Sequence, residues 1–249
     1  MHEPAEGMIG RVVRILGTFD SERTVQTASE ISRRSGLPMS TTHRVVADLR
    51  ANGLLEGDER GGVRIGMRLW ELTTRGSRAL RLREVALPHM GDVQRAVRQH
   101  TQLGVLEDDE VLFLERLSHP AATSNITRIA GRLPLHASSS GLVLLAHGDS
   151  DLLDRVLARP LTTFTADTPA DEPALRRKLS EVRRLGHAVA EGYIEPETAG
   201  LAVPVRAGRS VVAAISVVVP RDTRYEVPAL AALRSAAEGI AADLATPAP

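Results

Sequence analysis

The sequence predicts a two-domain α+β protein, with a small N-terminal head and a larger domain behind it. Its 249 residues exceed the usual size of a single domain. The first 66 residues carry the signals of short helices and one hairpin, whereas the remainder mixes strand and helix patterns in the order typical of an antiparallel α+β domain. We therefore expect a head at 1–66, a linker helix at 67–83 and a second domain at 84–249.

Residues 24–66 have the pattern of a winged helix-turn-helix. Thr27 and Glu30 form a capping box, in which each side chain satisfies a backbone N–H at a helix start. Gly36 permits the turn after that helix, and Pro38 suits the first turn of the next one. Spacings of three and four residues then predict one buried helix face, formed by Thr42, Val45, Val46 and Leu49. Residues 54–56 and 63–65, joined by a glycine-rich turn, predict the hairpin of a wing.

The outward side of this head predicts contacts with DNA. Ser40 and Thr41, near a helix N-terminus, can hold a phosphate together with free backbone amides. Arg44, one turn further on, can form a bidentate contact with a guanine edge, worth roughly 1–3 kcal/mol of discrimination. Arg60 and Arg64 on the wing would touch the DNA backbone. His43 completes the candidate set, although a histidine at such a position more often packs or caps a helix than reads a base.

Charge is unevenly distributed along the chain. The net charge is zero, but residues 60–83 contain seven arginines against one acid, Glu71, a local charge of +6. This stretch can attract phosphates, or it can simply be a solvated helix face.

The segment from residue 67 to about residue 82 predicts a helix with apolar residues at three- and four-residue spacing. A helix between two domains, apolar on one side and basic on the other, suits pairing with its copy in a second subunit. We therefore expect dimerisation through this linker, which the only tryptophan, Trp70, would report by fluorescence.

The rest of the chain predicts the second domain. A helix at 83–99 is expected to be interrupted, or to start, near Pro88. Strands are predicted at 103–106, 111–117, 124–129, 187–191, 199–206 and 211–219. Helices are predicted at 138–147, 150–158, 171–185 and 228–244.

Several classes of protein are disfavoured. No apolar run is long enough to span a bilayer, and the first residues lack a secretion signal, so we expect a cytoplasmic protein with no membrane partner. Without cysteine there is no disulfide, thiol nucleophile or Cys-ligated zinc, and we expect no cofactor. His136 beside three serines admits acyl transfer, but no Gly-x-Ser-x-Gly elbow occurs, so we expect no enzyme. A ligand-sensing or scaffolding protein without DNA binding is the other alternative.

The chain resembles the IclR family of bacterial transcriptional regulators over nearly its full length. The resemblance rests on Gly36-Leu37-Pro38, Ser40-Thr41, His43-Arg44, residues 82–89 and, most specifically, residues 131–137 (Gly-Arg-Leu-Pro-Leu-His-Ala). It implies a winged helix-turn-helix, a linker helix, a GAF-like effector-binding domain, and dimers or dimers of dimers on double-stranded operator DNA. It also implies control by a small-molecule effector, with repression the commoner outcome. Met39 stands where the family often has a basic residue, which weakens one phosphate contact.

The family's effector contacts, carried over by resemblance, fall on seven positions: Ser138, Ser139, Ser140, Ala190, Gly200, Ser216 and Val218. The family usually has an acid at 190, often a cysteine at 200 and frequently a serine at 218. Since three polar positions are small or apolar here, we expect a roomier and more apolar pocket than one built for a very small organic acid. Glu191 is a poor replacement for the acid, because neighbouring strand residues face opposite sides. Alternatively, the serines only cap a helix.

Overall fold

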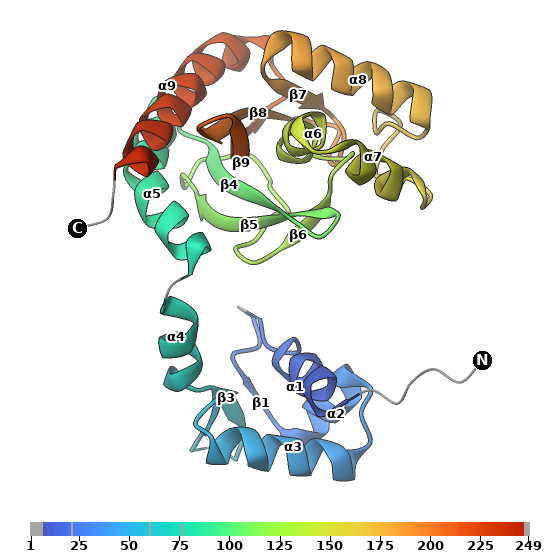
Figure 1. The fold of residues 1–249 in the computed structure, drawn as a ribbon, viewed down its shortest axis with the longest axis vertical. Helices are drawn as coiled ribbons and strands as arrows, with labels where there is room; N and C mark the ends of the chain where they lie inside the picture. The colour runs from blue at the N-terminus through green and yellow to red at the C-terminus, as the bar shows by residue number, and fades with distance from the viewer. Residues whose placement is uncertain (1–6, 21, 60, 76, 247–249) are drawn as a thin grey trace. The chain divides into compact units, whose positions relative to one another are not determined.

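The computed structural model describes residues 7–20, 22–59, 61–75 and 77–246. The chain divides into two compact units, Met1–Ser77 and Arg78–Pro249 (Figure 1). Both combine helices with antiparallel strands, which confirms the two-domain α+β prediction.

The first unit is a helix-turn-helix with a small sheet. Its helices are α1 (Met8–Leu16), α2 (Ala28–Ser35), α3 (Met39–Ala51) and α4 (Met67–Thr74). Its strands are β1 (Val25–Gln26), β2 (Leu55–Gly57) and β3 (Val63–Ile65), paired antiparallel in the order β1-β3-β2. The hairpin β2–β3 is the predicted wing.

The local signals of this unit act as the sequence predicts. Thr27 and Glu30 form both bonds of the capping box, and Gly36 takes a left-handed φ of 68° between α2 and α3. Pro38 is the N-cap of α3 rather than part of its first turn. The predicted face of α3, with all four of its residues buried, packs in a core with Ile15 and Ile31.

Two elements of the first unit were not predicted. Helix α1 lies before the stretch on which the prediction was built, and it contributes the fully buried Ile15 to the core. Strand β1 has only two residues, Val25 and Gln26, which pair with Arg64 and Val63. A strand this short gives no alternation to detect.

The prediction of one linker helix from residue 67 to residue 82 is wrong. Helix α4 ends at Thr74, Arg75 has extended backbone (ψ 103°), and a separate helix, α5 (Arg78–Val97), begins the second unit. Helix α5 also continues through Pro88 without the predicted interruption. It buries Leu82, Ala86, Met90, Val93 and Val97 in a core shared with helix α9 (Glu226–Ala245). This burial outweighs the one helical hydrogen bond that proline removes.

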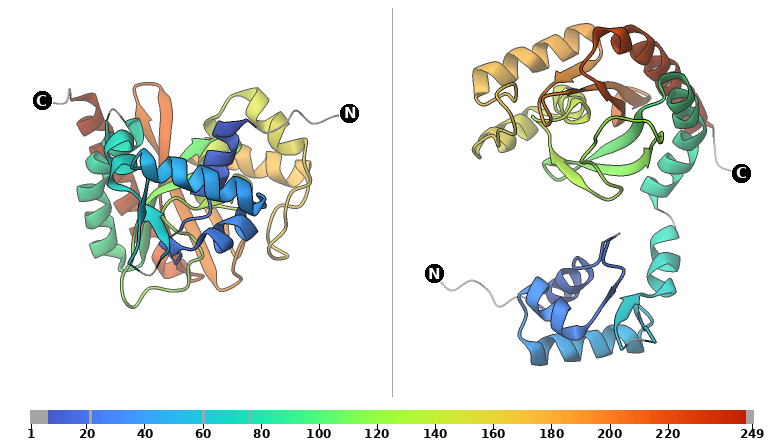
Figure 2. Two further views of the ribbon diagram at one scale, coloured as in Figure 1. Left: turned by 90° about the horizontal axis from the view of Figure 1, so that it is seen from below. Right: turned by 180° about the vertical axis from the view of Figure 1, so that it is seen from behind.

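The second unit is built on a six-stranded antiparallel sheet in the order β6-β5-β4-β9-β8-β7. Its strands are β4 (His100–Glu107), β5 (Glu110–Leu117), β6 (Arg132–Pro134), β7 (Ala188–Glu191), β8 (Thr198–Ala207) and β9 (Ser210–Pro220). One face carries α5 and α9, which lie side by side in Figures 1 and 2. The other carries α6 (Ser139–His147), α7 (Ser150–Leu157) and α8 (Glu172–Leu185), and a short 3-10 helix, η1 (Thr223–Tyr225), precedes α9.

The alternation of strand residues separates two cores. In β9, Ile215, Val217 and Val219 pack toward α5 and α9, whereas Ala214 packs toward α6. Ser216 shares the α6 side, because it lies two residues from Ala214 in the same strand. No helix in the described part of the chain is long and apolar enough to cross a membrane.

The predicted strand at 124–129 is also wrong. This segment is an irregular coil, and the strand that pairs with β5 on the side away from β4 is β6, at Arg132–Pro134. Local polar contacts replace strand pairing: the amide and hydroxyl of Thr127 both donate to Oδ1 of Asn125, at 3.0 and 2.8 Å, and Arg116 donates to the Thr127 carbonyl. Side chains that bond their own backbone in this way compete with sheet formation. The other predicted helices and strands of this unit are observed within a few residues of their predicted ends.

Candidate functional site

The exposed surface of α3 carries the predicted DNA-reading residues. Ser40, His43 and Arg44 are exposed, and Thr41 is half-buried. Among the described residues, Arg44 has no hydrogen-bond or ion-pair partner. Its guanidinium is therefore free to contact a ligand outside the chain.

The N-terminus of α3 has unused backbone amides. The first hydrogen bond of the helix is donated by the Thr42 amide to the Pro38 carbonyl, at 2.9 Å. The amides before Thr42, those of Ser40 and Thr41 included, therefore have no place in the helical ladder. Amides and hydroxyls at a helix N-terminus together suit a phosphate oxygen.

On the wing, Arg64 is exposed on β3 and lies 3.4 Å from the carboxylate of Glu56 on β2. A contact between Arg64 and a phosphate would have to compete with this exposed ion pair, which is a weak competitor. Arg60, the other predicted wing contact, lies outside the described residues.

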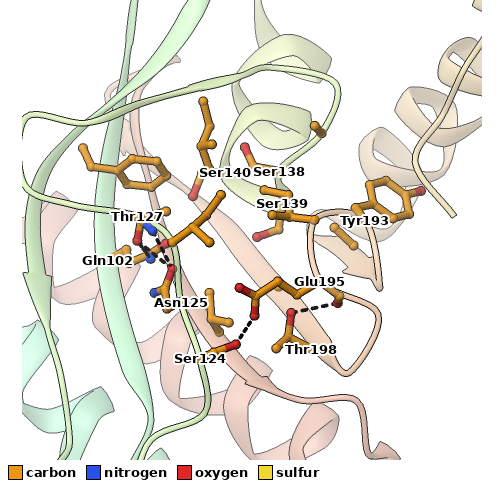
Figure 3. A pocket seen from close by; sticks show the side chains of 18 residues that line it. Gln102, Ser124, Asn125, Thr127, Ser138, Ser139, Ser140, Tyr193, Glu195 and Thr198 are labelled. Carbon is orange, nitrogen blue, oxygen red and sulfur yellow. Dashed lines mark hydrogen bonds between the residues drawn. The ribbon is translucent and has the colours of Figure 1, made fainter. Parts of the chain in front are cut away.

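A pocket opens in the second unit between the start of α6, the strands β7 to β9 and the coil at 124–127 (Figure 3). The space between its atoms amounts to about 490 Å³, a figure that includes open solvent at its mouth. Six of the seven predicted effector positions line it: Ser138, Ser139, Ser140, Ala190, Gly200 and Val218. Residues that the sequence does not indicate as effector contacts also line it, among them Gln102, Phe113, Ser124, Asn125, Tyr193 and Glu195.

The three serines are arranged as a helix start. Ser138 is the N-cap of α6, and its hydroxyl accepts a hydrogen bond from the Gly141 amide at 3.1 Å. The amides of Ser139 and Ser140 precede the first helical bond, which the Leu142 amide donates to the Ser138 carbonyl at 2.8 Å. The alternative that these serines only cap a helix thus holds for Ser138, whereas the first two amides of the helix have no place in its hydrogen-bond ladder.

Ser216 lies behind the pocket wall rather than on it. It is buried, accepts a hydrogen bond from Ser140 at 2.9 Å, and donates to Oε1 of Gln102 at 3.3 Å. Gln102 in turn donates to Thr127, which donates to Asn125. This network fixes α6, two strands and the coil relative to one another. One donor in it, Nδ2 of Asn125, is buried without a hydrogen-bond partner in the part of the chain that is described.

Ala190, Gly200 and Val218 form a row across three neighbouring strands. Ala190 pairs with Gly200, and Gly200 pairs with Val218. A Cβ atom at Gly200 would lie only 2.8 Å from the Ser139 hydroxyl oxygen, so a larger residue there would displace Ser139. The position of the Ser139 side chain therefore requires a glycine at residue 200.

The acid of the pocket is Glu195, not Glu191. Glu191 is exposed, lies 3.7 Å from Arg221 and does not line the pocket. The Glu195 carboxylate lines the pocket and accepts a hydrogen bond from Ser124 of the facing coil. Tyr193, two residues earlier in the chain, also lines the pocket; burial raises its pKa, and the carboxylates of Glu181, Asp167 and Glu191 raise it further.

His136 is a structural residue. It is buried, and its Nε2 donates to the Thr162 carbonyl at 2.9 Å. Burial lowers its pKa, and the bond to Thr162 opposes that effect. No histidine lines the pocket, and the described residues contain no cluster of three His, Cys, Asp or Glu side chains that could hold a metal ion.

Two protein-family models match the chain. One, described as the IclR helix-turn-helix domain, covers residues 9–59. The other, described as the C-terminal domain of the bacterial transcriptional regulator IclR, covers residues 77–242.

Individual relatives agree with these matches. A crystal structure of an IclR homolog from Microbacterium hydrocarbonoxydans, complexed with 4-hydroxybenzoate, is 55% identical, has a TM-score of 0.91, and is matched over 96% of this chain and 99% of that one. The transcriptional regulator XynR of Escherichia coli is 32% identical over 84% of each chain. The transcriptional repressor AllR of the same species is 28% identical over 72% of this chain and 67% of its own.

Proposed function

The protein belongs to the IclR family of bacterial transcriptional regulators, and we propose that it is a repressor released from its operator by a small aromatic carboxylate. DNA binding through the winged helix-turn-helix follows from the family. The sign of regulation and the effector class are the proposal. The pocket carries it: two unused helix-start amides, those of Ser139 and Ser140, face a largely apolar space. We place the protein in the bacterial cytoplasm, where operator DNA is found.

An aromatic carboxylate fits both halves of this pocket. The amides of Ser139 and Ser140 and the positive end of the α6 dipole suit a carboxylate. Phe113, Ala190 and Val218 give the apolar walls that suit a ring. A relative at 55% identity is known with 4-hydroxybenzoate bound, which supports an effector of this class here.

The same pocket supports binding rather than catalysis. The Ser140 hydroxyl donates a hydrogen bond to Ser216, and no histidine of the described chain lines the pocket to act as a base. Since a serine nucleophile needs such a base, we propose an effector site and not an active centre.

We further propose that the protein acts as a dimer, or a dimer of dimers, with two DNA-binding heads. Helix α4 has no buried residue, and Met67 and Trp70, one turn apart, are 63% and 61% exposed. An apolar helix face without a covering element suits a second copy of that helix. Two linked heads would bind half-sites about one helical turn, or a multiple of it, apart.

Binding of the protein to DNA from upstream of its own gene, measured with and without 4-hydroxybenzoate, tests this function. We expect a specific complex that weakens when the effector is added, as linkage between two sites requires. Arg44→Ala should weaken the complex about 5- to 150-fold, the equivalent of roughly 1–3 kcal/mol, and relax its sequence preference. Arg209→Ala, an exposed arginine of the second unit, is the matched control. Wild-type affinity and specificity in Arg44→Ala would remove Arg44 as the reading residue.

Calorimetry of the intact protein tests the effector class. We expect measurable binding of 4-hydroxybenzoate and much weaker binding of pyruvate or glyoxylate, because a two- or three-carbon acid leaves the apolar walls unfilled. Tighter binding of either small acid would contradict the proposed pocket chemistry.

A further inference from the structure

The pocket is polarised, with hydrogen-bond donors at the start of α6 and a carboxylate across from them. In Figure 3, Ser138 and Ser140 lie at one end of the labelled group, whereas Ser124, Glu195 and Thr198 lie at the other. Glu195 is the only charged residue that lines this pocket in the described part of the chain. A ligand that carries negative charge is therefore attracted to one end and repelled from the other.

We propose that Glu195 selects effectors that carry a hydrogen-bond donor, such as a phenolic hydroxyl, on the ring side opposite the carboxylate. This inference rests on the proposed function, since it takes the effector to be an aromatic carboxylate. It adds the residue that distinguishes one such carboxylate from another.

The carboxylate of Glu195 has capacity for such a donor. Its Oε2 accepts from the Ser124 hydroxyl, and within the described structure no hydrogen bond to Oε1 is found. The backbone carbonyl of the same residue accepts from both the amide and the hydroxyl of Thr198, at 3.0 and 3.1 Å. The main chain of Glu195 is thus fixed, and the Ser124 contact orients the carboxylate.

The other end of the pocket offers donors rather than acceptors. The amides of Ser139 and Ser140 are unused by the helix there. A further buried donor, Nδ2 of Asn125, belongs to the coil that also carries Ser124, and among the described residues it has no hydrogen-bond partner. The orientation of the Asn125 amide is set by the Thr127 amide, which donates to its Oδ1 at 3.0 Å. An anion placed near the two amides at the start of α6 satisfies groups that otherwise cost free energy.

A ligand that matches both ends has one carboxylate and one donor on a rigid ring. A second carboxylate in place of the donor would face Glu195, and like charges at close range are costly. A methoxy group in place of the hydroxyl leaves Glu195 without a proton to accept. The affinity of the pocket for a para-substituted benzoate therefore depends on whether the substituent can donate a hydrogen bond to Glu195.

The test is a calorimetric panel of benzoate, 4-hydroxybenzoate and terephthalate against wild type, Glu195→Gln and Glu195→Ala. For wild type we expect 4-hydroxybenzoate to bind at least about tenfold more tightly than benzoate, because a hydrogen bond to a charged acceptor is strong. Terephthalate should bind most weakly of the three. In both variants the preference for 4-hydroxybenzoate should shrink, more in Glu195→Ala, and terephthalate should gain affinity.

Glu197→Gln, an exposed acid two residues away, is the matched control and should keep the wild-type ranking. If all three ligands bind, but the ranking is the same in wild type and both Glu195 variants, the role of Glu195 is overturned while the effector class stands. If none of the three binds to wild type, the effector class itself fails, and the inference fails with it.

Discussion

At the scale of single residues, burial decides what His136 can do. Its ring is enclosed beside the start of α6, and its one hydrogen bond is donated to the Thr162 carbonyl. A neutral imidazole satisfies that carbonyl, whereas a protonated ring would place a charge in a poorly solvated site. The lowered pKa of His136 expresses this cost.

Because the folded state lowers the pKa of His136 below the ordinary value of 6.5, the unfolded chain binds the proton more readily. The free energy of unfolding should therefore be fully retained above about pH 6.5 and should decrease as the pH falls below it. Urea titrations between pH 5 and 8 measure this, with His136→Gln as the variant and His43→Gln as the exposed control. The His136→Gln profile should be flatter than the wild-type profile; profiles of equal slope would contradict the assignment.

Single residues are predictable where a short motif fixes the chain locally, whereas their contacts with DNA or an effector stay predictions. The helix start at Ser138 to Ser140 follows from the sequence, and the resemblance adds Ala190, Gly200 and Val218. Glu195 could not be found in this way, because it lies in a loop without periodicity and faces the pocket only through the contact with Ser124. The sequence does contain one weak indication. Because position 190 lacks the acid that the family usually has, another acidic residue near the end of that strand, such as Glu195, was a candidate.

At the scale of elements, β5 connects two layers of the second unit. The pairing of β4 with β5 shifts between Leu103 and Gly104, so Leu114 is an extra residue in β5. Beyond this bulge, Glu115 meets Arg83 of α5 at 2.6 Å, whereas Arg116 contacts the coil of the pocket wall. Glu115 is only 4% exposed, so Arg83 supplies the opposite charge that a buried carboxylate needs.

Arg83→Ala should lower the free energy of unfolding of the second unit by roughly 1–3 kcal/mol, because it leaves Glu115 buried without its cation. The lower part of this range applies because the Arg83 side chain is 39% exposed, and solvent weakens its interaction with Glu115. Adding Glu115→Gln should recover part of the loss, since the neutral amide needs no counter-charge. Urea unfolding followed by circular dichroism measures both variants, and equal stability of Arg83→Ala and wild type would contradict the role of the pair.

Element predictions failed where tertiary packing replaced a local rule. Pro88 is a helix breaker by its own chemistry, yet α5 runs through it because one face of that helix is buried against α9. At Gly239 of α9 an added Cβ would lie 2.4 Å from the His89 ring, so the two helices approach closely there. The local sequence pattern at 124–127 predicts a strand, but the segment is a coil. The hydrogen bonds that Gln102 and Arg116 donate to Thr127 come from distant parts of the chain, so a local pattern cannot reveal them.

At the scale of the whole molecule, the division between the units falls at residues 77 and 78, and the predicted linker is divided with it. Length and composition predict two domains, but they cannot place the boundary, since the helical pattern continues across it. Helix α4 is left with exposed apolar side chains in the described chain, which is the basis for the proposed dimer.

Trp70→Glu should shift the protein from dimer toward monomer, because it places a charge on the apolar face of α4. Sedimentation measured over a range of concentrations should show a dissociation constant raised at least about tenfold, the equivalent of more than about 1.4 kcal/mol. Trp70→Phe should stay close to wild type. Operator affinity should fall together with dimerisation, and an unchanged dissociation constant would place the dimer interface elsewhere.

The neighbouring residues Glu115 and Arg116 have one more consequence. Glu115 binds Arg83 of α5, and Arg116 binds the Thr127 carbonyl in the wall of the pocket. These two residues are joined by one peptide group, and the Arg116 amide also donates to the Glu115 carboxylate at 2.8 Å. At this point the two sides of the sheet cannot slide past one another without breaking a charge-assisted bond. Helix α5, which begins directly after the junction with the DNA-binding unit, is thereby held in a fixed position relative to the coil that lines the pocket.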